Sequence, residues 1–212
     1  MEIVFPTLAG DGGLSCPFDP RSVVRPLKSA GVAIEAIASA CRVGAAEKTA
    51  EHAVDRIHLA RLLGATLLNF YFSETETQEH ADRPPSDASE SSSIILDVLR
   101  QVRYEAEAAG VTIALETCAN VSFSNPLGLR EVIDEANSWT VGACVDAGRT
   151  VEGGSAEDWL RTLRQRVRCV RVKLFEPQNG EAIGLAPELS EVLGEIQYEG
   201  PVVYQMDVGK GL

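Results

Sequence analysis

The sequence predicts an α/β fold in which a parallel sheet curls into a β/α barrel, and three observations support this. Apolar segments of strand length alternate along the chain with segments of helical periodicity. No predicted strand is followed by the glycine-rich loop of a dinucleotide or P-loop fold. The strands of the second half carry polar residues near their C-terminal ends, which in a barrel all face one cavity.

The strands are predicted from short apolar runs whose side chains alternate between two faces. In 111–116, bulky aliphatic residues at every second position alternate with Thr112, Ala114 and Glu116. The other strands of the second half divide in the same way, so one face suits helices and the other a crowded interior with a polar mouth. The predicted strands are 3–6, 32–38, 66–72, 111–116, 141–146, 169–174 and 201–205.

The helices are predicted from apolar residues that recur at steps of three and four. The clearest segment is 93–110, which ends at Gly110. Asn125 before Pro126, and Ser155 three residues before Asp158, are typical helix starts. Right-handed crossovers through these helices would join successive parallel strands. The predicted helices are 45–64, 93–110, 126–138, 156–167 and 187–197, with a further start at Asp19 and Pro20.

About seven strands are one short of a closed TIM-type barrel, and residues 208–212 are too few for a final helix. We therefore expect an incomplete barrel, clipped at both ends. Three explanations stay open: a homo-oligomer in which a partner covers the gap, an open seam with unpaired edge strands, and a native start upstream of Met1.

Composition indicates one globular domain over 1–212, because 212 residues with 45% hydrophobic content can bury one substantial core. A polar stretch at 73–92 is expected to be a mobile, solvated loop, with a lid over the cavity as the alternative. A formal charge of −12 disfavours nucleic acid as a partner. No leader-like start or bilayer-length apolar run occurs, so we expect a cytoplasmic protein without membrane contact.

Reactive side chains are expected where the strands of the second half end. Glu116, Asp146, Arg171 and Gln205 each follow an apolar run and are predicted to meet in one cavity, with Asn69 as a further ligand contact. The three histidines fall in a helix or in the polar loop. The five cysteines are an odd number without close spacing, so reduced thiols are expected. Cys118, with no histidine near it to activate it, is interpreted as a passive thiol.

The second half of the chain resembles the xylose-isomerase-like TIM barrel superfamily, which includes sugar isomerases, sugar epimerases and the endonuclease IV group. Segment 105–116 is similar to the family's helix-to-strand segment that ends in a metal-binding Glu. Segment 141–149 is similar to its strand ending Asp-Thr-Gly-His, and 169–173 and 200–205 match its last two strands. The resemblance implies a sugar substrate, one divalent metal held by Glu, Asp, His and a second Glu, and proton transfer by the two Glu residues.

Several positions depart from this pattern. Arg171 stands where the His ligand is expected, and a guanidinium has no lone pair to give a metal. Gln205 stands in place of the second Glu and cannot accept a proton, so a two-carboxylate relay is lost. Glu116, Asp146 and Lys173 match the family, whereas Arg149 and Leu174 replace its His and Asp.

Two functions therefore stay open. In the first, the chain is a divergent sugar isomerase or epimerase in which Glu116 is a lone base, Lys173 assists it, and Arg171 replaces the metal. Arg149, Gln205 and Asn69 would complete a site for a small sugar or sugar acid. In the second, an inactive barrel binds a sugar or a small anion, or serves as a scaffold.

A metal enzyme is a weaker third interpretation. The ligands would be Glu116, Asp146 and Gln205, whose oxygens suit Mg²⁺ or Mn²⁺. Glu35, in the early strand 32–38, is expected either to point inward as another carboxylate or to be an ordinary strand-edge charge.

Overall fold

The computed structural model describes residues 2–5, 20–42, 46–73, 88–116, 123, 125–147, 154–174 and 185–206. Within them seven strands form one sheet in the order β1 to β7, and each strand pairs in parallel with the next. The strands are β1 (Glu2–Phe5), β2 (Ala36–Arg42), β3 (Leu67–Ser73), β4 (Thr112–Glu116), β5 (Val141–Asp146), β6 (Val167–Leu174) and β7 (Val202–Met206).

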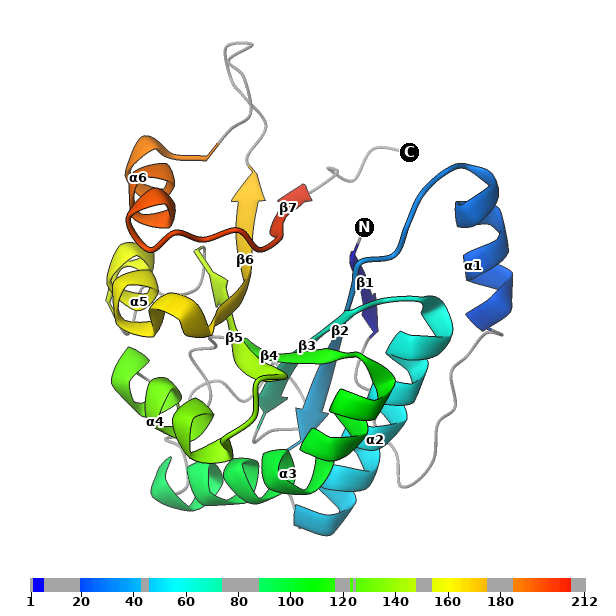
Figure 1. The fold of residues 1–212 in the computed structure, drawn as a ribbon, viewed down its shortest axis with the longest axis horizontal. Coiled ribbons are helices and arrows are strands. Elements are labelled where there is room, and N and C mark those ends of the chain that lie inside the picture. The colour runs from blue at the N-terminus through cyan, green and yellow to red at the C-terminus, as the bar shows by residue number, and fades with distance from the viewer. Residues whose placement is uncertain are drawn as a thin grey trace.

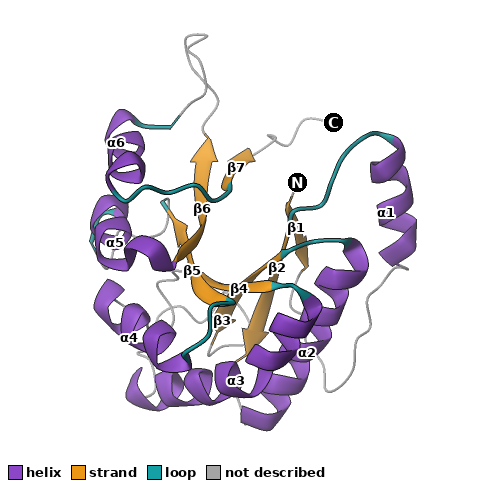
Figure 2. Cartoon of the chain, viewed as in Figure 1, coloured by secondary structure: helices purple, strands orange, loops and turns teal. Residues whose placement is uncertain are grey.

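The sheet curls so that its strands surround a common interior, with β1 and β7 at its two edges (Figure 1). Helices cover the outside of this curl (Figure 2). The sequence prediction of an incomplete α/β barrel is therefore confirmed. The helices are α1 (Pro20–Ser29), α2 (Ala46–Leu63), α3 (Ala88–Ala109), α4 (Pro126–Ala136), α5 (Ala156–Leu163) and α6 (Pro187–Glu195).

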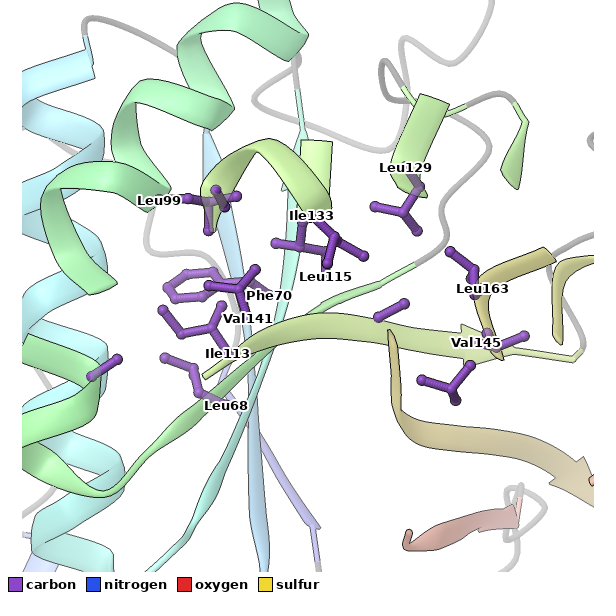
Figure 3. Packing of buried hydrophobic residues seen from close by; sticks show 14 of the residues in the cluster. Leu68, Phe70, Leu99, Ile113, Leu115, Leu129, Ile133, Val141, Val145 and Leu163 are labelled. Carbon is purple, nitrogen blue, oxygen red and sulfur yellow. The ribbon is translucent and has the colours of Figure 1, made fainter. Parts of the chain in front are cut away.

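The outer face of the sheet forms the main hydrophobic core with the helices. Ile113 and Leu115 of β4 are fully buried there and lie close to Leu99 of α3 and Ile133 of α4 (Figure 3). Burying one such side chain contributes about 1.5–3 kcal/mol. These residues are the bulky set that strand alternation assigned to the helical side, so burial on this face is the main force that holds the layers together.

The inner face is lined by small residues. Ala36, Ala114, Cys144 and Cys169 form a second buried cluster with Leu67, against which Val203 packs. Side chains from several strands converge inside a curled sheet, so only small ones fit at this level. The interior of the curled sheet is therefore narrow below the polar residues at the carboxyl ends of the strands.

Some predicted boundaries are wrong. Strand β2 begins at Ala36, and the preceding Glu35 is exposed, so the prediction that Glu35 points inward is wrong. The residues directly before β2 belong to a connecting segment. There the backbone carbonyl of Glu35 accepts hydrogen bonds from the amides of Thr66 and Leu67, both at 3.2 Å. Strand β6 begins at Val167, directly after a short 3₁₀ turn, Arg164–Arg166.

The polar stretch predicted as a loop is shorter than expected at both ends. Ser73 is the last residue of β3, and α3 already begins at Ala88, because serines are tolerated in a first helical turn. The remainder of the predicted loop, 74–87, lies outside the described residues. None of the helices in the described ranges has the length and apolarity to cross a membrane.

Candidate functional site

Three of the predicted site residues lie on adjacent strands at the C-terminal end of the sheet. Glu116 is the last residue of β4 and Asp146 the last residue of β5, while Arg171 of β6 pairs in register with Asp146. All three are buried, with 3%, 4% and 7% of their surface exposed. Parallel strands bring their carboxyl ends to one edge, which is why residues far apart in sequence meet here.

The guanidinium of Arg171 contacts both carboxylates. Its Nη1 donates to Oε2 of Glu116 at 2.5 Å and lies 3.8 Å from Oδ2 of Asp146. A buried carboxylate is costly unless a charged partner and hydrogen bonds compensate it. Arg171 therefore acts as a fixed internal cation for two anionic groups.

A polar layer lies beneath this ion cluster. Asn69 of β3 is fully buried, and its Nδ2 donates to Sγ of Cys169 on β6 at 3.9 Å, so side chains of non-adjacent strands meet inside the curl. Cys169 pairs in register with Cys144. A hydrogen bond with Cys169, and then burial, raise the pKa of the Cys144 thiol. Both cysteines are free, as predicted, and such buried thiols are poor nucleophiles.

The other predicted site residues are placed differently. Gln205 lies on edge strand β7, where it pairs in register with Lys173 and is exposed. It falls on the same face as Val203, which packs on the inner cluster, but at the open seam of the sheet. The side chain of Lys173, the whole of Arg149 and Cys118 lie outside the described residues, so the structure does not address their predicted roles.

The donor set does not fit the divalent metal that the resemblance implies. The guanidinium of Arg171 lies between the two carboxylates that would be ligands, and it would repel a cation held there. Among the described residues, no three His, Cys, Asp or Glu side chains are grouped so that they could hold a metal ion. The guanidinium of Arg171 is the positive charge that contacts both carboxylates.

Comparison with family models matches residues 17–209 to the xylose isomerase-like TIM barrel family. The chain belongs to this family. A comparison with curated protein sequences finds no match. Within the family's fold, the ion cluster lies at the carboxyl ends of the strands, the end at which TIM barrels carry their active sites.

Solved structures of the same fold include enzymes that act on sugars. D-psicose 3-epimerase from Clostridium cellulolyticum H10, solved with D-tagatose, has a TM-score of 0.71 and 16% identity, covering 91% of this chain and 70% of its own. AP endonuclease family 2 from Brucella melitensis has a TM-score of 0.72 and 18% identity, covering 99% and 83%. IOLI protein, solved with a zinc atom, has a TM-score of 0.67 and 15% identity, covering 96% and 77%. At these identities the likeness concerns the fold.

A separate hollow of about 530 Å³ lies at the opposite end of the sheet. It is lined by residues around the starts of β5 and β6, among them Trp139, Asp134 and Arg166. Several of its polar groups are already used within the chain: Arg166 pairs with Asp134 through two hydrogen bonds, and Ser138 donates to Glu107 at 3.2 Å. This hollow is therefore explained by loop packing, and the ion cluster remains the candidate site.

Proposed function

We propose that the chain is a sugar isomerase-like protein whose site uses an internal arginine in place of a metal ion. The substrate would be a small sugar or sugar acid with a carbonyl group. The observation that carries the proposal is the buried contact of Arg171 with both Glu116 and Asp146 at the carboxyl ends of β4 to β6. Membership of the family and the epimerases among the structural neighbours support the substrate class.

The chemistry assigned to these residues is a proton transfer. Glu116 accepts a proton from the carbon next to the substrate carbonyl, while Arg171 donates a hydrogen bond to the carbonyl oxygen as negative charge develops on it. Asp146 stays beside Arg171 and holds the guanidinium in place. The proton of the adjacent hydroxyl passes to the former carbonyl oxygen, and the protonated Glu116 returns its proton to the former carbonyl carbon, so that the carbonyl group moves by one carbon.

A single carboxylate favours isomerisation over epimerisation. Inverting a carbon requires proton delivery to the opposite side of the substrate, and Gln205, at the position of the family's second Glu, has no proton to give or take in this role. Glu116 returns the proton to the side from which it came, which suits transfer between adjacent carbons. Lys173, Arg149, Gln205 and Asn69 are proposed to contact the substrate's oxygens.

A second function is a binding protein without catalysis, and one observation favours it. The 2.5 Å ion pair already engages Glu116 with Arg171, and a substrate carbonyl has to displace part of this contact before a proton can be removed. A ligand whose hydroxyl groups bind at the rim would leave the pair intact.

Heavy-water exchange separates the two functions. The protein is incubated in heavy water with a panel of aldoses, ketoses and sugar acids, and NMR detects deuterium at the carbon next to the carbonyl. The enzyme hypothesis expects exchange with the native protein and its loss in Glu116→Gln, with Glu195→Gln on the surface as the matched control. A rise in melting temperature with one of these compounds, without exchange, supports the binding protein, and neither response refutes both.

A further inference from the structure

Strand β6 contains an irregularity directly before the residues that enter the site. Val167 pairs with Ala143, but the next pair is Cys169 with Cys144, so Arg168 is an extra residue with no partner position on β5. This is a β-bulge, which is uncommon in parallel sheets. Bulges often re-aim side chains beside functional sites.

The bulge reverses which side of β6 faces the interior. Val167 and Val170 both pack in the outer core, although they are three positions apart and regular alternation would place them on opposite faces. Cys169 lies in the inner cluster and Arg171 contacts the inner carboxylates. If Arg168 instead took a regular place in the ladder after Val167, Arg171 would point toward the helices, so the bulge keeps Arg171 inside by leaving Arg168 out of the pairing.

Gly142 of β5 supplies the space for this bulge. A Cβ at position 142 would lie 2.4 Å from the backbone oxygen of Arg166 and 2.4 Å from Cγ of Arg168, closer than real side chains approach. The guanidinium of Arg168 is held at the start of the sheet, where it donates to the carbonyls of Gln165 at 3.3 Å and Trp139 at 3.2 Å. The missing side chain at Gly142 therefore leaves the space that Arg168 and the adjacent backbone occupy.

The geometry points to Gly142 and Arg168 as positioning residues for the site: the bulge they form takes Arg168 out of the ladder and so keeps Arg171 on the inner face of the sheet. This inference rests on the proposed function, since it explains how that site acquires its cation. It assigns the effect to the bulged backbone at position 168 and to the missing side chain at position 142, and the arginine side chain at 168 is secondary.

Two variants separate the backbone from the side chain at position 168. Arg168→Ala keeps the extra residue and removes the guanidinium, whereas deletion of Arg168 removes both. The measurement is ¹⁵N NMR of arginine side chains, with the Arg171 signals identified by their absence in Arg171→Lys. A buried, ion-paired guanidinium exchanges its protons slowly with water. We expect this protection in the native protein, in Arg168→Ala and also in the deletion variant, because without residue 168 the ladder is regular and Cys169 and Arg171 stay opposite Cys144 and Asp146.

A glycine pair provides the second test. Gly142→Ala is expected to displace the bulge and to lower the protection of the Arg171 signals about tenfold or more, and deletion of Arg168 in the same chain is expected to restore it, because the ladder then needs no bulge. Gly194→Ala on α6 is the matched control, because a Cβ there meets no atom within 4 Å and the residue adopts no left-handed conformation. Circular dichroism and melting temperature identify the variants that fold.

The outcomes decide the proposal in each case. It is overturned if folded Gly142→Ala keeps protected Arg171 signals, or if Arg168→Ala or the folded deletion variant loses them. It is also overturned if Gly142→Ala does not fold, either alone or with Arg168 deleted, while Arg168→Ala does, because Gly142 would then serve folding as a whole. None of these readouts depends on sugar binding or turnover, so failure of the positioning role and failure of the proposed function remain distinguishable.

Discussion

Two Arg–Glu ion pairs each join two elements of this protein, in contrasting surroundings. Arg171 and Glu116 connect β6 to β4 at 2.5 Å, with 8% and 1% of their side chains exposed. Arg161 and Glu195 connect α5 to α6 at 2.9 Å, with 48% and 54% exposed. The chemical groups are the same, but water screens the second pair and is excluded from the first. The comparison teaches that burial decides how much an ion pair contributes to the free energy of unfolding. Each member of the interior pair therefore depends on the other more than the members of the surface pair do.

The largest expected effect comes from removing the interior cation. Arg171→Met leaves two buried carboxylates without their positive partner, and we expect a loss of about 3–5 kcal/mol in the free energy of unfolding at neutral pH. Urea denaturation measures it. A loss below about 1 kcal/mol, the range of an exposed pair, would erase the contrast between the two regions.

Removing both charges of the interior pair tests whether the two groups interact directly. The double variant Glu116→Gln with Arg171→Met carries one buried negative charge fewer than Arg171→Met, so we expect it to be the more stable of the two. A double-mutant cycle should give a coupling energy of about 1–3 kcal/mol. Additive effects of the two substitutions would contradict a direct interaction between these groups.

His52 lies in an environment between those of the buried ion pair and the exposed ion pair. It is half-buried on α2, and burial, followed by the charge of Arg56, lowers its pKa below 6.5. The unfolded chain therefore binds a proton on this group more readily, so its effect is absent well above pH 6.5 and destabilises the fold as pH falls through that value. We expect the native protein to lose more stability than His52→Gln between neutral and mildly acidic pH, measured by urea denaturation. Equal losses would refute this.

The smallest effect is expected at the surface pair. Arg161→Met should lower the free energy of unfolding by about 0.2–1 kcal/mol at low salt. Because salt screens exposed charges, this difference should shrink at about 1 M salt, whereas the effect of Arg171→Met should persist. Denaturation of both variants at two ionic strengths provides the measurement, and a similar salt dependence for both would place the interior pair in contact with solvent.

The sequence was sufficient to anticipate much of the fold and part of the candidate site. Alternation in 111–116 placed Leu115 outside and Glu116 inside, and the polar ends of three strands do meet. The inward placement of Glu35 failed because β2 begins one residue after it. The contact between Asn69 and Cys169 joins residues on β3 and β6, and no pattern within either strand predicts it.

Local patterns by themselves determined the alternation of strands and helices, the face on which most strand residues lie, and the polar residues at the strand ends, because a strand's period and a helix's period are properties of short segments. Only the tertiary structure decided that Arg168 lies outside the ladder in a bulge beside Gly142, that Arg171 therefore faces Glu116 and Asp146, and that Gln205 lies at an exposed edge. Register is a relation between distant segments, and a shift of the pairing by one residue moves every following side chain to the other face.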